Sequence, residues 1–259
     1  MASERDFGLV CEVEPATTPD LMRVRHQIGV MSRIASAFLI PDNHIGRATV
    51  SSIAVAHEVA LMGGRSIACL NARDRNLLGF RRDLLTAAAY GVDEFLFVYG
   101  DRPESGTRSD DLTVRSMISE ARRFADGDKP NAKPFRVGVT TGLRALPAWK
   151  READFLFVQV SFSINELLDW RASVDFAGPV YAGVMVVASA AMGRKVSADV
   201  PQLAVPAPII GRIERDPDAG ITIACDFIEE IRHSGVFDGI HLIPVSRYRE
   251  ITRRLEATR

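Results

Sequence analysis

The carboxylate of Asp101 follows an apolar run, Phe95-Leu96-Phe97-Val98-Tyr99, within the tetrapeptide Gly100-Asp101-Arg102-Pro103. The run predicts a buried strand, the glycine permits a sharp turn or a close ligand, and the proline ends the strand's hydrogen-bond ladder. Asp101 is therefore expected at the C-terminal end of a strand, where parallel α/β folds bind their ligands. An Asp beside Gly and Pro is also common as a turn or capping residue, and this alternative stays open.

Polar side chains also stand at the ends of other apolar runs. Carboxylate, amide and guanidinium groups around one mouth suit a heterocyclic ligand, and a partly desolvated carboxylate there can act as a general acid. The set contains no His-rich or Cys-rich metal cluster, and the chain has no serine nucleophile elbow and no P-loop. Its members are Glu12, Glu14, Asp42, Asn43, Asn71, Asp101, Thr140, Thr141, Gln159, Ser161 and Arg247.

Several of these residues have a structural alternative. Glu12 and Glu14 share one face of a strand, so one or both can be a solvated end or part of the layer that plugs a barrel. Gln159 needs a partner if it is buried, and that partner is either ligand or backbone. Arg247 can lie on a helix face. The residues interpreted as packed or surface groups are His57, His233 and His241, with Cys69 as a small buried residue.

Eight short apolar runs alternate with helical patterns along the chain, and each run predicts a strand. Eight βα units in a chain of 259 residues predict a single-domain (β/α)8 TIM barrel over residues 1–259. An open doubly wound sheet is the alternative, but the expected Gly-rich phosphate turn after the first run is absent. The predicted strands are 7–13, 35–40, 66–70, 95–99, 135–139, 155–160, 180–187 and 240–245.

Helix signals follow most of the predicted strands. Ser163-Ile164-Asn165-Glu166 is a capping box, a helix is expected near 219–233, and Ser246 is expected to open the last helix. Ser109 is expected to cap a helix after the fourth strand. The inward residues of that helix are Leu112, Met117, Ile118 and Phe124, and a helix after the third strand places Leu77, Leu78, Leu84 and Leu85 on one face.

Composition excludes several classes of protein. Net charge is −1, with 47% hydrophobic and 25% charged residues, which is typical of a soluble globular protein and gives no electrostatic footprint for nucleic acid or an acidic membrane. The N-terminus has no secretory signal pattern, and no apolar stretch is long enough to span a membrane. Cys11, Cys69 and Cys225 are isolated and odd in number, as reduced thiols are. We expect a cytoplasmic protein that binds a small molecule and can form a homo-oligomer.

The chain resembles the methylenetetrahydrofolate reductase family, whose fold is a (β/α)8 barrel. Cys11-Glu12-Val13-Glu14-Pro15 is similar to the family's Phe-Glu-Phe-Phe-Pro opening, with Glu12 on the catalytic acid. Tyr99-Gly100-Asp101 and its Pro-Gly-rich continuation resemble the Arg-Gly-Asp segment, and Gln159 resembles the pterin-binding Gln. Further similar segments are Gly183-Val184-Met185-Val186, Val205-Pro206 and Ser246-Arg247.

The resemblance implies a folate-linked oxidoreductase of one-carbon metabolism and methionine biosynthesis. It would reduce 5,10-methylenetetrahydrofolate to 5-methyltetrahydrofolate, or run the reverse, with FAD passing hydride from NAD(P)H. By the same resemblance Glu12 and Asp101 are catalytic, and Gln159 and Arg247 bind folate. The implied cofactor-binding residues are Tyr99, Gly100, Asp101 and Lys150, with no metal ligand.

The flavin side departs from the family pattern more than the pterin side. The third strand, Ala68-Cys69-Leu70-Asn71-Ala72, lacks a flavin-side histidine, and Thr140-Thr141-Gly142 replaces Tyr-Pro-Glu. Two alternatives follow: a flavin-independent enzyme that uses a nicotinamide or deazaflavin donor directly, and a folate-binding barrel that serves methyl transfer. A barrel lyase or aldolase would call for a strand-end Lys or a metal set, and the strand ends show neither.

Overall fold

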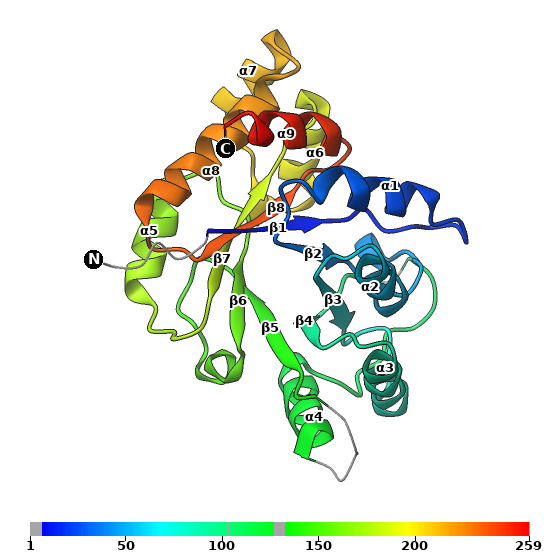
Figure 1. Ribbon diagram of the computed structural model, residues 1–259. Helices are drawn as coiled ribbons and strands as arrows, with labels where there is room; N and C mark the ends of the chain where they lie inside the picture. The colour runs from blue at the N-terminus through cyan, green and yellow to red at the C-terminus, as the bar shows by residue number, and fades with distance from the viewer. Residues whose placement is uncertain (1–6, 103, 127–132, 259) are drawn as a thin grey trace.

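Eight parallel strands close into a barrel in chain order, because β8 pairs with β1 (Figure 1). The computed structural model describes residues 7–102, 104–126 and 133–258, so Pro103 of the tetrapeptide lies outside the described residues. The predicted TIM barrel is confirmed, and the open sheet is excluded. The strands are β1 (Gly8–Glu12), β2 (Ala37–Ile40), β3 (Ser66–Asn71), β4 (Glu94–Val98), β5 (Arg136–Thr141), β6 (Phe155–Val158), β7 (Val180–Met185) and β8 (Gly239–Ile243).

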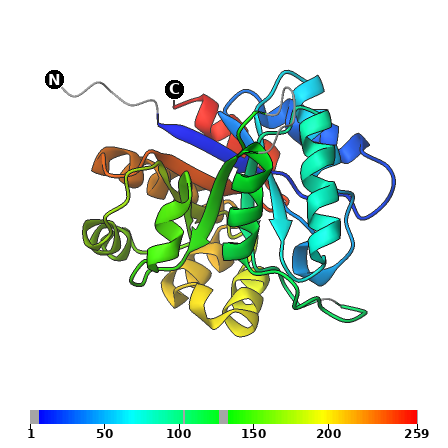
Figure 2. The same ribbon diagram turned by 90° about the horizontal axis from the view of Figure 1, so that it is seen from below.

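Helices surround the barrel, and the last of them packs against the first (Figures 1 and 2). The β5–β6 connection holds only a short 3-10 helix, Ala148–Glu152, where a helical segment was expected. The longer excursion between β7 and β8 holds three helices. The helices are α1 (Met22–Met31), α2 (Ser52–Leu61), α3 (Leu77–Ala89), α4 (Val114–Asp126), α5 (Ile164–Ser173), α6 (Ala190–Asp199), α7 (Ala207–Arg215), α8 (Ala219–Ser234) and α9 (Tyr248–Glu256).

The predicted inward face of α3 is confirmed for Leu84 and for half-buried Leu77 but wrong for Leu78 and Leu85. Phe80, Leu84 and Ala87 face the core, whereas Leu78 and Leu85 are 77% and 53% exposed. Spacings of four and three residues set the buried stripe of a helix, and the Leu78–Leu85 pair falls outside it.

The start of α4 was also placed too early. The helix begins at Val114, and the hydroxyl of Thr113 accepts the Ser116 N–H at 3.1 Å. Ser109 lies in the preceding loop, where its N–H donates to the Arg73 carbonyl at 2.6 Å. The inward residues of the prediction are nevertheless buried: Leu112, Met117, Ile118 and Phe124.

Two other helix starts differ in how well they were predicted. The capping box is confirmed, because the Ser163 hydroxyl accepts the Glu166 N–H at 3.3 Å. The last helix begins at Tyr248, two residues after Ser246. The helix expected near 219–233 is α8.

Alternate residues of each strand fill the barrel interior, and the others pack under the helices. At the N-terminal end of the barrel, Glu94 forms ion pairs with Arg65 at 2.6 Å and with Arg136 at 3.1 Å. These paired charges close that end of the barrel. The apolar layers above are Val10, Ala37, Leu39, Ile67, Cys69, Leu96, Phe155 and Phe157. Residues of this same alternation reach the upper mouth, where the polar strand ends were predicted to meet.

One glycine makes room for the aromatic part of this interior. A Cβ on Gly138 of β5 would lie 2.0 Å from the Phe155 ring, a distance that no real contact shows. The ring therefore occupies the place of a β5 side chain. Phe155 and Phe157 pack against each other at 5.7 Å between centroids, so β5 must stay small for β6 to carry both.

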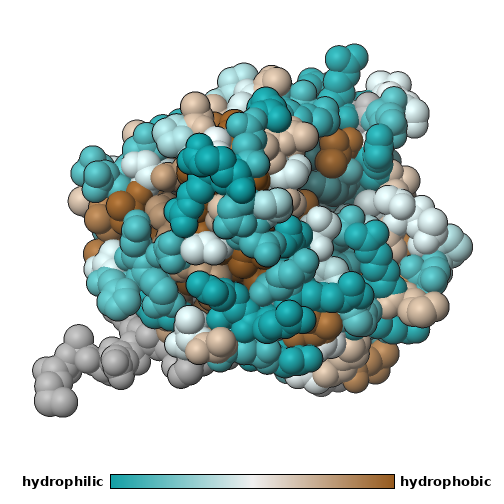
Figure 3. Space-filling model, turned by 90° about the horizontal axis from the view of Figure 1, so that it is seen from above, coloured by the Kyte–Doolittle hydropathy of each residue, from teal (hydrophilic) through white to brown (hydrophobic). Residues whose placement is uncertain are grey.

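Hydrophobic residues are scattered over the face of the molecule that Figure 3 shows. The face in Figure 3 is mostly hydrophilic, with separate hydrophobic side chains among polar ones. In the part of the chain that the structure describes, no helix is long and apolar enough to cross a membrane.

Candidate functional site

Glu12, the predicted acid, stands at the end of β1 and meets a histidine from β8. Its Oε2 lies 3.1 Å from His241 Nε2, and the two side chains are 17% and 11% exposed. The contact requires one proton between the two atoms. The pair is therefore a hydrogen bond between a carboxyl group and an imidazole at the carboxyl end of the barrel.

His241 is packed, as predicted, but its contact with Glu12 was missed. Its ring stacks on Phe157 of β6 at 5.1 Å between centroids and 18° between planes. In the β1–β8 ladder Val10 pairs with His241, so Glu12 and His241 rise from adjacent strands. The alternation of residues along the strand could have predicted this contact. Gly239, His241 and Ile243 lie on one face of a buried strand, and in a barrel one face of each strand points to the interior.

Glu14 does not join this pair. Its carboxylate forms an ion pair with Arg23 at 2.6 Å, and 46% of the side chain is exposed. Its backbone is held by buried Gln27, whose Oε1 accepts the Glu14 N–H at 3.0 Å and whose amide donates to the Glu14 carbonyl at 3.2 Å. Glu14 is therefore the solvated end that the sequence left open.

A large cavity of about 1170 Å³ opens beside β5 and β6. Gln159 and Lys150 line it, whereas Glu12, Asp101 and Arg247 do not. Its walls come from the ends of both strands, from α5 and from the segment before α7. The lining residues are 140–145, Lys150, 159–163, Glu166, Asp169, Trp170, Ser173, 202–204 and Pro206.

Gln159 joins the cavity to the barrel mouth. Its side chain is exposed, and its N–H donates to the Thr141 carbonyl at 2.8 Å. It lies two residues after Phe157, on which His241 stacks. The Gln159 side chain is therefore exposed in the cavity, on the same alternation as Phe157.

Lys150 is half-buried in the same cavity. Its Nζ donates to the Thr140 carbonyl at 2.7 Å. Burial, followed by the charge of Arg144, lowers the pKa of the Lys150 ammonium. Thr140 and Thr141 line the cavity beside it, and Ser161 donates its hydroxyl proton to Glu166 at 3.3 Å.

Arg247 is bound to carboxylates outside the cavity. It forms ion pairs with Asp218 and, at 3.1 Å, with Glu250. Its side chain is 19% exposed. Arg247 is therefore partnered within the protein, close to the start of α9.

Asp101 joins two loops at the rim. Its Oδ2 accepts the Ile45 N–H at 3.0 Å, and Asp101 itself is exposed. The Glu104 N–H donates to the Gly46 carbonyl at 2.9 Å in the same contact. Ile45 has φ 58°, a conformation that β-branched residues rarely adopt, so this contact holds a strained turn.

Gly100 and Tyr99 lie beside this contact. Gly100 has φ 93°, and a Cβ there would lie 2.9 Å from Asn71, so the position requires glycine. The Arg73 guanidinium stacks 4.4 Å above the Tyr99 ring. Both residues are therefore engaged with the β3 loop.

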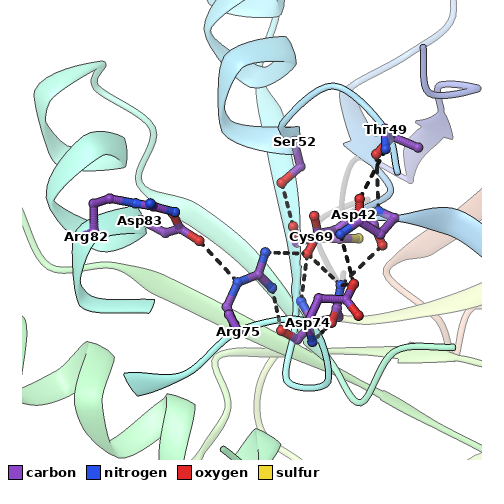
Figure 4. Close-up of polar contacts among 10 residues, drawn as sticks. Asp42, Thr49, Ser52, Cys69, Asp74, Arg75, Arg82 and Asp83 are labelled. Carbon is purple, nitrogen blue, oxygen red and sulfur yellow. Dashed lines mark hydrogen bonds and ion pairs between the residues drawn. The ribbon is translucent and has the colours of Figure 1, made fainter. Parts of the chain in front are cut away.

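A buried polar network occupies the ends of β2 and β3 (Figure 4). Asp42 Oδ2 accepts the N–H of Asn71 at 3.0 Å and receives Arg75 at 2.8 Å. Arg75 also reaches Asp83 at 3.1 Å and the Asn71 carbonyl. Burial raises the pKa of the Asp42 carboxyl, and the Arg75 charge opposes that rise. Asn43 extends the network through a 2.8 Å hydrogen bond to Asp74.

The remaining predicted non-ligands behave as expected. Cys69 is buried, and desolvation raises the pKa of its thiol well above the ordinary value. His57 stacks on Tyr90, and exposed His233 contacts the Glu229 carbonyl. Among the described residues, no group of three or more His, Cys, Asp or Glu side chains is placed to hold a metal ion.

The residues implied for FAD do not share the large cavity. Lys150 lines it, whereas Tyr99, Gly100 and Asp101 do not. Asp101 and Tyr99 also have partners within the protein at Ile45 and Arg73. The described residues therefore do not fit the implied flavin set as one cavity, and we derive no chemical step through a flavin.

Comparison with known proteins places this geometry in a family. No curated protein sequence matches the chain. Among solved structures, an uncharacterized protein from Clostridium thermocellum, described as binding two copies of 5-methyl-5,6,7,8-tetrahydrofolic acid, has a TM-score of 0.65 at 12% identity, over 98% of this chain and 97% of that one. Tryptophan synthase from M. tuberculosis has a TM-score of 0.52 at 13% identity, over 98% and 93%. At these identities the similarity shows the barrel fold.

The sequence comparison is more specific than the structural one. A profile described as methylenetetrahydrofolate reductase matches residues 13–258, from the residue after Glu12 to the end of the described chain. The match spans strands β2 to β8, all nine helices named above and the residues that line the cavity. The chain belongs to the methylenetetrahydrofolate reductase family.

Proposed function

We propose that the protein binds a reduced folate at the carboxyl end of the barrel and reduces 5,10-methylenetetrahydrofolate to 5-methyltetrahydrofolate, or runs the reverse. The observation that carries the proposal is the Glu12–His241 pair, a half-buried carboxyl group hydrogen-bonded to an imidazole at the barrel mouth. Family membership supports the substrate class. The folate ligand described for the Clostridium thermocellum protein supports it as well.

Glu12 acts as the proton donor in this proposal. The bond between the methylene carbon and the bridging nitrogen breaks with its electrons on nitrogen, and that nitrogen takes the Glu12 proton. The remaining iminium carbon then accepts a hydride that originates from NAD(P)H. His241, at 3.1 Å from the carboxylate, orients Glu12 and can return a proton to it.

Gln159 holds the pterin edge in the same proposal. A primary amide offers both a donor and an acceptor, which matches the alternating edge of a pterin. Gln159 is exposed and directly follows β6, the strand whose Phe157 contacts His241. Arg247 contributes less directly, because its guanidinium is already paired with Asp218 and Glu250.

Substitution of Glu12 tests the proposal. Glu12→Gln keeps the shape and removes the transferable proton, so we expect turnover to fall by about 10²–10⁴-fold with 5-methyltetrahydrofolate still bound. Glu14→Gln is the matched control, since Glu14 lies on the same segment but pairs with Arg23. Near-normal turnover of Glu12→Gln, measured with a reduced nicotinamide donor, would show that Glu12 is not the acid.

A flavin-independent reaction is the second candidate. The observation that favours it is the engagement of Asp101 with Ile45 and of Tyr99 with Arg73. FAD, when bound, would relay hydride between NAD(P)H and folate. An absorbance spectrum of the purified protein, with and without added FAD, separates the two. Yellow protein or tight FAD uptake argues for the flavoenzyme, and turnover without FAD argues for direct transfer. Folate binding without turnover by any donor would support a methyl-transfer barrel.

We also propose that the protein works in the cytoplasm. Cys69 and Cys225 are free and buried. Unpaired thiols suit a reducing compartment.

A further inference from the structure

A second cavity lies among the helices, over the end of β7. It measures about 380 Å³ and is lined by the start of α5, by α7 and by α8. Both α5 and α7 pack against α8. Glu12, Gln159 and His241 do not line it, so this cavity is separate from the residues assigned to folate chemistry. Its volume is at the lower end of the range for small-molecule sites, which favours a small ligand.

The floor of this second cavity is apolar. The first turn of α8 closely approaches the end of β7, because a Cβ on Gly220 would lie only 2.1 Å from the Val187 carbonyl oxygen. The side chains of the floor belong to a hydrophobic cluster that is separate from the main core, and most of them are only partly buried. They are Phe162, Met185, Val187, Ile209 and Ile223. The floor can therefore receive an apolar group of a ligand, whose burial is favourable.

Charged residues of opposite sign stand on two walls of the second cavity. Arg212 comes from α7, whereas Asp226 and Glu230 come from α8. Asp226 and Glu230 are four residues apart, so they lie on one face of that helix. In the part of the chain that the structure describes, none of these three side chains forms a hydrogen bond or an ion pair. The cation and the two carboxylates therefore share one cavity without pairing across it.

Other charges on the same helices do have partners. Glu214 of α7 forms an ion pair with Arg194 of α6. Glu229 of α8 forms an ion pair with Arg232 one turn further on. The unpaired state of Arg212, which lies on the same helix as Glu214, is therefore specific to the cavity and leaves its guanidinium available to a ligand.

We propose that the second cavity binds a free α-amino acid with a large apolar side chain. Arg212 holds the carboxylate of the amino acid, Asp226 and Glu230 hold its ammonium group, and the floor receives its side chain. An apolar carboxylic acid would leave the two carboxylates of α8 without a partner, and an apolar amine would leave Arg212 without one. A zwitterion with an apolar side chain matches both walls and the floor.

Titration calorimetry of the full-length protein tests the proposed ligand class. L-leucine and L-phenylalanine are expected to bind at millimolar concentration. Glycine should bind at least about tenfold more weakly, because it places no carbon atoms on the apolar floor. Leucine amide lacks the carboxylate and N-acetyl-leucine lacks the ammonium group. Each should bind about three- to fivefold more weakly than leucine, which corresponds to the loss of one exposed charge pair.

Substitutions on the two walls locate the site. Arg212→Gln should weaken leucine binding about three- to fivefold but leave leucine amide unaffected, because that ligand has no carboxylate to lose. The double substitution Asp226→Asn with Glu230→Gln should weaken leucine in the same way and leave N-acetyl-leucine unaffected. Arg215→Gln is the matched control, since Arg215 is exposed on the same helix and does not line the cavity. All four residues are exposed, so the variants should fold, and thermal melting checks this.

Several results would overturn the proposed amino-acid site. Absence of leucine and phenylalanine binding at millimolar concentration would remove the ligand class. Equal affinity for glycine and leucine would show that the apolar floor takes no part. Equal affinity for leucine, leucine amide and N-acetyl-leucine would show that the charged walls take no part. Leucine binding that neither Arg212→Gln nor the double substitution alters would place the ligand elsewhere on the protein.

Discussion

Charged residues on the two sides of the barrel mouth differ in whether they have partners within the protein. At the ends of β2 and β3, Arg75 is 12% exposed and reaches Asp42, Asp83 and the Asn71 carbonyl. Beside β5 and β6, Arg144 and Lys150 line a cavity without a carboxylate partner among the described residues. A satisfied network fixes structure, whereas unpaired cations in a cavity are suited to a ligand. Stability and binding should therefore respond separately on the two sides.

The largest effect on stability is expected on the satisfied side. Arg75→Ala leaves Asp42 buried without its cation, so we expect a loss of about 3 kcal/mol in the free energy of unfolding. This should appear as a fall in Tm on the order of 5–10 °C. Arg82→Ala is the control, because Arg82 contacts the same Asp83 at 3.2 Å but is 76% exposed. Arg144→Ala, by contrast, should change Tm little. A large loss in Arg144→Ala, or none in Arg75→Ala, would remove the difference between the two sides.

An intermediate effect is expected at Asp101. Asp101→Ala removes the acceptor of the Ile45 N–H and should cost about 1 kcal/mol or less. Asp101→Asn keeps an amide oxygen for that hydrogen bond and removes only the charge. If Asp101 mainly holds the loop, the Asn variant should match the wild type in Tm and turnover. Lower turnover of the Asn variant at unchanged Tm would instead place the Asp101 charge in the chemistry, as the family resemblance implies.

The smallest effect is expected from the titration of Lys150. Its pKa in the folded protein lies below the ordinary 10.5, so between these two values the unfolded chain binds more protons than the folded one. The contribution of Lys150 to stability therefore rises as pH rises through that window. The Tm of the wild type relative to Lys150→Met should increase on the order of 1 °C toward pH 10.5. A decrease with pH would contradict the sign.

Much of the fold could be predicted from local patterns. Each of the eight apolar runs forms a strand, because a buried parallel strand needs a short, nearly continuous apolar segment. The capping box at Ser163 was readable for the same local reason. Helix starts without a strong cap were predicted less accurately. The start of α4 was predicted too early because Ser109 hydrogen-bonds to the Arg73 carbonyl in the loop instead of capping the helix.

The candidate site was predicted in part. Glu12 and Gln159 are at strand ends as expected, but the partner of Glu12 is 229 residues away in sequence. The sequence did not identify Arg144 and Asp169 as cavity residues, because the local sequence does not distinguish a charged residue that lines a cavity from one that is solvated. Only their shared cavity, and the lack of partners within it, distinguishes them from solvated charges.

The sequence by itself determined the eight strands, their order and the polar residues that end them, because these depend on hydrophobic period and turn chemistry over a few residues. Tertiary structure alone decided which of those polar residues meet. Barrel closure brings β8 beside β1 and so His241 to Glu12, while Asp101 binds Ile45 and Arg144 stays unpaired. Which charges pair depends on the face of the strand that each residue occupies and on how the barrel closes. Both are long-range properties that a local sequence pattern does not predict.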